Sequence, residues 1–161
     1  MSFAVIIEKD GLSVEISVSS INLVFKETDS YLSVSVPDAD LHYYVYENFQ
    51  GGEILLTQDS AEFIRLNISD IQLYYGSKSN SVMIEGRKKT YTPVVDSYLI
   101  PDSRVTNVKS RGNNKFYTVL GDSFIYKPGD SVTTQGETFT VNAVTYSFQN
   151  TKYSIVIERV V

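Results

Sequence analysis

Few side chains in this sequence could perform acid–base or nucleophilic chemistry. His42 is the single histidine and the chain has no cysteine, which excludes a thiol nucleophile and a disulfide framework and leaves a zinc site with at most one nitrogen ligand. A serine nucleophile would need an oriented imidazole, and no motif supplies one near His42. The pattern around His42 favours a surface or interface residue on an alternating strand.

Carboxylates are the remaining candidates for chemistry, and they gather in the first half of the chain. Glycoside hydrolysis or calcium binding could use such residues, but their spacing selects no pair and completes no calcium-binding loop. Asp38 and Asp40 are better explained as turn residues that bond their own backbone. The candidates are Asp38, Asp40, Glu47, Glu53 and Asp59.

No glycine-rich phosphate loop of the dinucleotide-binding or nucleoside-triphosphate type occurs. We therefore predict a chain that is not an enzyme and that holds no cofactor and no metal.

Basic residues interleaved with aromatic residues could form a platform for nucleic acid. The residues with this pattern are Arg87, Lys88, Lys89, Tyr91, Arg104, Lys109, Arg111, Lys115, Phe116 and Tyr117. The isoelectric point of about 4.8 opposes phosphate binding. Nucleic acid is therefore an unfavoured partner.

Tyrosine is abundant, with 12 residues and no tryptophan, and this composition suits a binding surface because tyrosine offers contact area with a polar end. Tyr43, Tyr44 and Tyr46 lie within four residues. One interpretation buries one face of their segment and presents Tyr44 and Tyr46 to a partner. The other interpretation buries both faces inside a sandwich.

The residue types that must position these side chains indicate an all-β protein. The chain has 19 Val, 13 Ile, 12 Thr, 12 Tyr and 8 Phe, against 4 Ala, 10 Leu and 2 Met. Residues of the first group favour strands, and those of the second favour helices.

Two hairpins are predicted near the start. Asp10-Gly11 is typical of a two-residue turn, and pairing Lys9 with Leu12 puts three apolar pairs on one face. Residues 21–25 continue the alternation as another strand. The second hairpin joins Leu32, Val34 and Val36 to Leu41, Tyr43 and Val45 through the turn at 37–40. After Gly51-Gly52, a strand is predicted over 53–57.

Residues 59–75 fit two interpretations. Asp59 and Glu62 have the spacing of a capping box before a helical apolar pattern. The same segment also alternates with period two on either side of Ser69-Asp70, and its β-branched residues favour strands.

Beyond this segment, residues 77–81 are predicted as a turn, 82–85 as a strand, 86–89 as a basic turn and 91–100 as an extended segment. Further strands are predicted at 104–109, 115–120, 123–126, 131–134, 138–147 and 152–160. These short units have the size and turn spacing of a small SH3-like or OB-like barrel. We therefore predict a β-sandwich-like part over 1–100 and a barrel over 101–161, which could also pack as a single domain.

Charge is divided unevenly along the chain. Residues 1–80 hold twelve acidic and four basic side chains, whereas residues 81–161 hold seven and ten. One interpretation is two solvated surfaces. The other is association of copies, or of a copy and a neighbour, through an acidic patch and a basic patch. The candidate contact residues are Tyr44, Tyr46, Arg87, Lys88 and Lys89.

The apolar run Phe3 to Ile7 is too short for a signal peptide or a membrane span, and no other apolar run is long enough. We expect no membrane contact and synthesis in the cytoplasm.

The segment from Tyr126 through Pro128-Gly129-Asp130 to Val132, followed by Phe139-Thr140-Val141, resembles small all-β structural proteins of tailed bacteriophage particles. The resemblance covers mainly residues 101–161. It implies a virion component of the head–tail connector, tail-completion, tail or decoration type, which forms homo-oligomers or contacts neighbouring structural proteins. The alternative function is a carbohydrate- or ligand-binding β-sandwich that uses tyrosine faces with Asp38 or Asp40 as polar partners.

Overall fold

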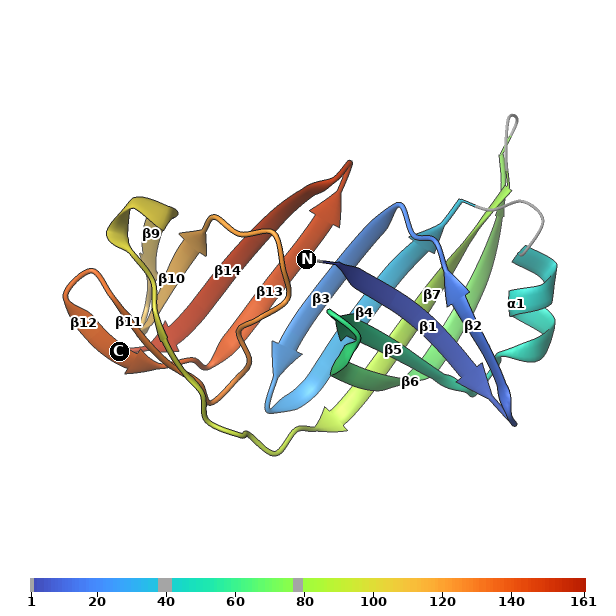
Figure 1. Ribbon diagram of the computed structural model, residues 1–161, viewed down its shortest axis with the longest axis horizontal. Helices are drawn as coiled ribbons and strands as arrows, with labels where there is room; N and C mark the ends of the chain where they lie inside the picture. The colour runs from blue at the N-terminus through green and yellow to red at the C-terminus, as the bar shows by residue number, and fades with distance from the viewer. Residues whose placement is uncertain (1, 38–41, 77–79) are drawn as a thin grey trace.

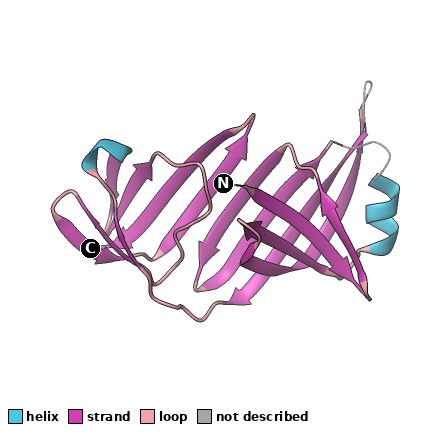
Figure 2. Ribbon diagram, viewed as in Figure 1, coloured by secondary structure: helices cyan, strands magenta, loops and turns pink. Residues whose placement is uncertain are grey.

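The computed structural model confirms the all-β class. It describes residues 2–37, 42–76 and 80–161, and 66% of the structure is strand while 6% is helix. Strands fill both halves of an elongated molecule, with a single α-helix at one end and a short 3₁₀ helix at the other (Figure 2).

Most strands belong to one antiparallel sheet of eleven strands, whose order is β2-β1-β5-β6-β7-β4-β3-β13-β14-β10-β9. Three more strands form a small sheet in the order β12-β11-β8, in which β8 and β11 are parallel. The elements are β1 Phe3–Lys9, β2 Leu12–Ile16, β3 Ser20–Lys26, β4 Thr28–Val36, α1 His42–Asn48, β5 Glu53–Gln58, β6 Ala61–Tyr75, β7 Asn80–Thr90, β8 Ser97–Leu99, the 3₁₀ helix Asp102–Arg104, β9 Val105–Arg111, β10 Asn114–Val119, β11 Ser131–Thr134, β12 Glu137–Thr140, β13 Ala143–Gln149 and β14 Lys152–Val160.

The first predicted hairpin is confirmed. Asp10 and Gly11 have φ values of 50° and 84°, as a type I′ turn requires, and Lys9 lies opposite Leu12. Val5 and Ile7 of this hairpin are buried in the core. The first hairpin therefore has the register expected from its turn.

Residues 59–75 adopt the strand interpretation. Asp59 and Ser60 both have positive φ and connect β5 to β6, which continues to Tyr75. The register between β6 and β7 shifts between Ile68 and Asp70, so a bulge bends the long strand at the position where the apolar alternation changes phase.

The second predicted hairpin is wrong, because α1 replaces its returning strand. Val45 and Phe49 are buried at helical spacing, whereas the three tyrosines beside them are exposed. An alternating reading of such a short segment cannot separate these two patterns. The predicted turn residues 38–40, and residues 77–79 of the next predicted turn, lie outside the described residues.

The predicted basic turn at 86–89 is also wrong, because β7 runs through it. Gly86 lies in mid-strand opposite Leu32 on one side and Ile68 on the other. A Cβ atom at Gly86 would lie 2.7 Å from Cγ2 of Ile54. This glycine therefore permits close packing between layers of the sheet rather than a reversal of the chain.

The large sheet curls so that distant strands pack together. Phe3 on β1 meets Phe148 on β13 with ring centroids 4.9 Å apart, although several strands separate β1 from β13 in the sheet order. Figure 1 shows β1, β2 and β5 crossing in front of β4 and β7. Aromatic contacts such as Phe25 with Phe63, at 5.6 Å, fill the space between these layers. Among the described residues, the curled sheet does not close into a barrel.

The C-terminal strands extend the same sheet, and the small sheet covers them. The rings of Tyr117 on β10 and Phe139 on β12 stack 4.9 Å apart.

Predicted strand 138–147 divides into β12 and β13, and residues 123–126 pack as a buried loop instead of a strand. Seven residues of β3 pair with β13, so one sheet crosses the predicted boundary at residue 100. The division into two domains stays a prediction.

Buried polar groups hold the loop at residues 123–126 and the Pro-Gly-Asp turn that follows it. Tyr146 is completely buried and its hydroxyl donates to the carbonyl of Tyr126 at 2.7 Å. Asp130 is likewise buried, and its carboxylate accepts N–H bonds from Lys127 at 2.8 Å and Asp96 at 3.2 Å. The Pro-Gly-Asp turn is therefore held by the aspartate side chain.

Candidate functional site

Exposed tyrosines gather at one end of the molecule. Tyr44 and Tyr46 on α1 are 39% and 42% exposed, and Tyr75 at the end of β6 is 61% exposed. The Tyr75 hydroxyl donates to that of Tyr43 at 2.8 Å, and this hydrogen bond raises the pKa of Tyr75 above its ordinary value. We call Tyr43, Tyr44, Tyr46 and Tyr75 the tyrosine cluster. It presents aromatic area with hydroxyl groups, which suits a polar protein contact.

The predicted basic residues lie on β7 and its neighbours. The Arg87 guanidinium lies 4.5 Å from the centre of the Tyr31 ring, and the Lys88 amine donates to the Arg65 carbonyl at 3.4 Å. Lys89 is exposed near the end of the strand. Arg87 and Lys88 are therefore held against the sheet by neighbouring groups, and all three cations lie on a strand rather than on a turn.

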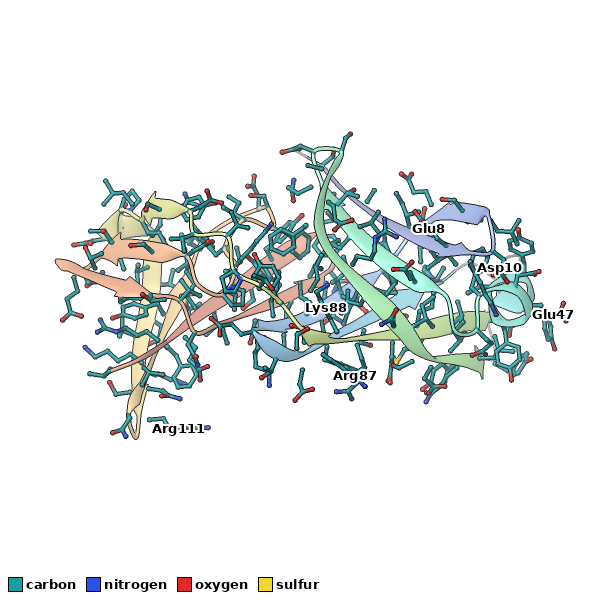
Figure 3. The ribbon with its side chains drawn as sticks, turned by 90° about the horizontal axis from the view of Figure 1, so that it is seen from below. Glu8, Asp10, Glu47, Arg87, Lys88 and Arg111 are labelled. Carbon is teal, nitrogen blue, oxygen red and sulfur yellow. The ribbon has the colours of Figure 1, made fainter. Side chains whose placement is uncertain are left out.

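The structure does not bring the tyrosines and the basic residues into one site. Tyr74 pairs with Ser81 at the start of β7, and Arg87 follows six residues later, about 20 Å along the strand. Figure 3 likewise separates Glu47 on α1 from Arg87 and Lys88. The two sets therefore lie on separate parts of the surface.

The candidate carboxylates have structural partners or lie apart from one another. Asp59 accepts the Ser2 N–H at 2.9 Å, and Glu53 lies 3.8 Å from Arg65. Glu47 is exposed on α1, and His42 begins that helix. The candidates Asp38 and Asp40 lie outside the described residues. Within the described segments, no cluster of three or more His, Asp or Glu side chains could hold a metal ion.

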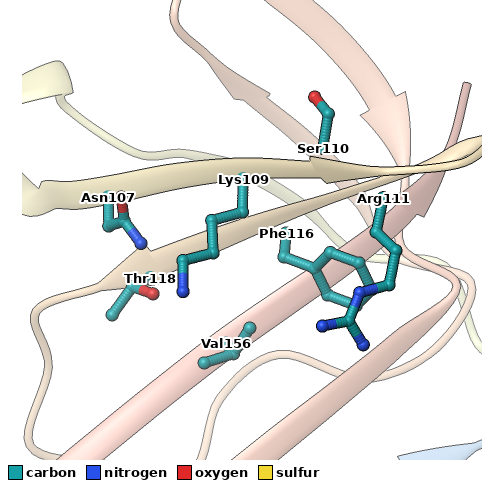
Figure 4. A pocket seen from close by; sticks show the side chains of 7 residues that line it. All are labelled: Asn107, Lys109, Ser110, Arg111, Phe116, Thr118 and Val156. Atoms are coloured by element: carbon teal, nitrogen blue, oxygen red, sulfur yellow. The ribbon is translucent and has the colours of Figure 1, made fainter.

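A shallow hollow lies on the outer face of β9, β10 and β14. Lys109 and Arg111 extend over the same face as Phe116 and Val156, while Ser110 points to the opposite side (Figure 4). The hollow has a volume of about 420 Å³, and Asn107 and Thr118 complete its lining. A cationic rim above an apolar floor fits an acidic group beside an apolar side chain.

Only part of the predicted basic and aromatic platform comes together in this hollow. Tyr117 is buried against Phe139, and Tyr91 packs on Phe25 with ring centroids 4.8 Å apart. Val156 was missed because it lies some 40 residues beyond Phe116 and carries no chemical signal of its own. Cross-strand pairing of β10 with β14 is what places it there.

No helix in the described part of the chain is both long and apolar enough to span a membrane.

The overall fold matches known tail-type proteins. The chain superposes on a tail protein from Neisseria meningitidis MC58 with a TM-score of 0.66 and 8% identity, covering 98% of this chain and 96% of that one. It superposes on the 43 kDa tail protein of prophage MuSo2 from Shewanella oneidensis with a TM-score of 0.65 and 8% identity, covering 100% and 98%.

A third similar structure is the E. coli c3393 protein, a component of the type VI secretion system that is described as structurally similar to the T4 bacteriophage tail proteins gp27 and gp5. Its TM-score is 0.64 with 8% identity, covering 94% of this chain and 75% of that one. No protein-family model matches the chain, and no curated protein sequence matches it.

These similarities confirm the resemblance to phage structural proteins at the level of the fold. They extend it from residues 101–161, where the sequence pattern suggested it, to nearly the whole chain.

Proposed function

We propose that this chain is a structural component of a phage tail or a related injection apparatus, resides in the virion, and acts by associating with copies of itself or with neighbouring structural proteins. The observation that carries the proposal is the shared fold with two phage tail proteins and one secretion-system component across 94–100% of the chain. A fold alone does not define a function, so the surfaces must supply the contacts.

Two surfaces support association. The tyrosine cluster offers aromatic residues of the kind enriched in protein interfaces. Arg87 and Lys89 offer exposed cations on one face of β7, with the half-buried Lys88 on the opposite face, and such cations suit an acidic neighbour. We propose Tyr44, Tyr46 and these three cations as contact residues toward neighbouring tail proteins.

The proposed role is non-enzymatic. The polar groups with the most partners serve the fold: Asp130 holds a turn, Tyr146 bonds a buried loop, and Arg65 bridges strands through Glu8 and Glu53. The contacts of these groups therefore account for structural roles and do not indicate a catalysed reaction. The narrower type, whether connector, tail-completion, tail or decoration protein, depends on the partner.

The direct test is the composition of particles. A strain carrying the gene with a short affinity tag would be induced, its particles purified on a density gradient, and each fraction analysed by mass spectrometry. The proposal predicts that the chain comigrates with tail proteins in the particle fraction. Recovery only among free proteins at the top of the gradient would overturn it.

Glycan binding is the second function predicted from the sequence, and the exposed tyrosine cluster is the feature that favours it, because sugar rings stack on aromatic faces. A glycan array with the purified chain tests it. Signal that disappears in a Tyr44→Ala, Tyr46→Ala double variant would support this function, and an array without signal would exclude it.

A further inference from the structure

The two ends of the molecule carry opposite charge. Figure 3 shows Glu8, Asp10 and Glu47 toward one end of the long axis and Arg111 at the other. The two ends also terminate the large sheet, because β2 and β9 are its outermost strands.

The first end carries the β1–β2 hairpin and, beside it, acidic residues of β5 and β6. Glu8, Glu53 and Glu62 surround the single guanidinium of Arg65, at distances of 3.0, 3.8 and 3.2 Å. One cation shared among three carboxylates leaves an excess of negative charge, to which the nearby hairpin residues Asp10 and Glu15 add.

The same hairpin carries an apolar side chain at its tip. Leu12 follows the Asp10-Gly11 turn and is 42% exposed, although it continues the inward face formed by Val5 and Ile7. Its cross-strand partner is Lys9, and Glu8 and Glu15 lie on the other face of the hairpin, so Leu12 is separate from the acidic face.

The second end has the complementary features. Lys109 and Arg111 are exposed beside Phe116 and Val156 in the hollow on β9, β10 and β14. Neither cation has a carboxylate within ion-pair distance among the described residues. Their charge is therefore available to a partner.

Strand β9 also has a free edge. Among the strands that the structure describes it pairs only with β10, and every residue from Thr106 to Arg111 is exposed. An edge strand presents unpaired N–H and C=O groups that can bind another strand, and β2 offers the same at the opposite end of the sheet.

We propose that copies of this chain associate head to tail, with the β1–β2 hairpin of one copy docked in the hollow of the next. The carboxylates of Asp10 and Glu15 face Lys109 and Arg111, and the edge of β2 lies along β9. The inference rests on the proposed function, because it specifies how copies meet within an assembly.

This contact is heterologous, since it joins two different surfaces of the same chain. Such contacts generate a closed ring where the rotation between copies closes, and a filament where it does not. Either form is compatible with a tail, whose parts repeat around or along one axis.

Charge exchange provides the test. The Lys109→Glu, Arg111→Glu variant reverses the hollow, and the Asp10→Lys, Glu15→Lys variant reverses the hairpin. All four side chains lie on exposed positions or a turn, so circular dichroism should match that of the wild-type chain. Sedimentation velocity at low salt should show assemblies for the wild type and monomers for each variant alone.

Mixing the two variants should restore association, because the intact hairpin of the first can dock on the intact hollow of the second. The dissociation constant should rise on the order of a hundredfold for each variant alone, since opposed like charges replace an attraction. Arg111→Glu alone should weaken assembly, whereas the matched control Lys152→Glu, at the exposed start of β14 and outside the hollow, should not.

Three results would overturn the inference: a wild-type chain that stays monomeric at every concentration, variants that assemble as the wild type does, or a mixture that stays monomeric. A monomeric wild type that binds single-stranded oligonucleotide through Lys109 and Arg111 would assign the hollow to nucleic acid instead. If the purified chain is monomeric in solution but is present in purified particles, the contact between hairpin and hollow is refuted and the proposed virion role stands.

Discussion

At the scale of single residues, the interior of this protein depends on a few polar atoms with defined partners. The Tyr146 hydroxyl donates to the Tyr126 carbonyl and accepts the Ile125 N–H at 3.3 Å, within a cluster of aromatic rings. Burial raises the pKa of Tyr146 well above its ordinary value, so the hydroxyl remains a neutral donor.

Tyr146→Phe should reduce the free energy of unfolding by about 1–3 kcal/mol, because two buried backbone groups lose their partner. Urea denaturation followed by circular dichroism measures this loss. Tyr153→Phe is the matched control: its hydroxyl has no hydrogen-bond partner among the described residues, so the loss should be smaller. Equal losses for the two variants would contradict the structural role of the Tyr146 hydroxyl.

Asp130 should make stability depend on pH. Burial raises the pKa of this carboxyl above 3.8, an effect that the N–H bonds from Lys127 and Asp96 only partly offset. The unfolded chain has the ordinary pKa, so the ionised carboxylate costs the folded state free energy at neutral pH. That cost is relieved as the pH falls through the raised pKa toward 3.8.

The free energy of unfolding of the wild type, relative to Asp130→Asn, should therefore rise as the pH falls from neutral toward 3.8. Parallel urea titrations of both proteins across this range measure the difference. Asp122→Asn removes an exposed carboxylate from the same loop and is the control. A difference that stays constant or shrinks with falling pH would show that burial does not raise the Asp130 pKa.

At the scale of elements, the sequence predicted those strands whose turns are local and whose faces alternate. Asp10-Gly11 specifies its own turn, and residues 131–134 and 152–160 emerge as strands close to the predicted bounds. Over residues 59–75, the β-branched composition predicted strands and the spacing of apolar residues allowed a helix. The strand prediction is confirmed.

The elements that escaped prediction depend on distant contacts. The segment at 42–48 alternates well enough to suggest a strand, on which Tyr43 and Glu47 would share the face of Val45 and Phe49. On the helix packed against β6 and β7, Val45 and Phe49 are buried while Tyr43 and Glu47 stay exposed. Gly86 suggests a turn locally, whereas Ile54 and Leu66 on other strands explain why a glycine is required. The β9–β10–β14 hollow likewise needs strand pairing that no local pattern contains.

Gly86→Ala should lower the free energy of unfolding by about 1–3 kcal/mol, because its Cβ would overlap Ile54 and press on Leu66 at 3.1 Å. Thermal or urea unfolding detects this loss. Ser81→Ala, a small change near the start of the same strand, should shift stability by only about 0.5 kcal/mol. A neutral Gly86→Ala variant would mean that Ile54 and Leu66 can move away from β7 without loss of stability.

At the scale of the whole molecule, the uneven charge of the sequence becomes an uneven charge in space. The acidic hairpin and the cationic hollow occupy opposite ends of one continuous sheet. The sequence predicted this polarity and its two interpretations, but only the curled sheet shows which residues of each sign face outward together. The proposed head-to-tail contact would use this polarity, because it joins the acidic end of one copy to the cationic end of the next.

The most direct measurement is the mass of the purified full-length chain by light scattering, over a concentration series at low and high salt. Association through opposite charges predicts assemblies of discrete mass at low salt, which dissociate toward the 18.1 kDa monomer as salt screens the contact. A monomer at every concentration and every salt level would contradict it.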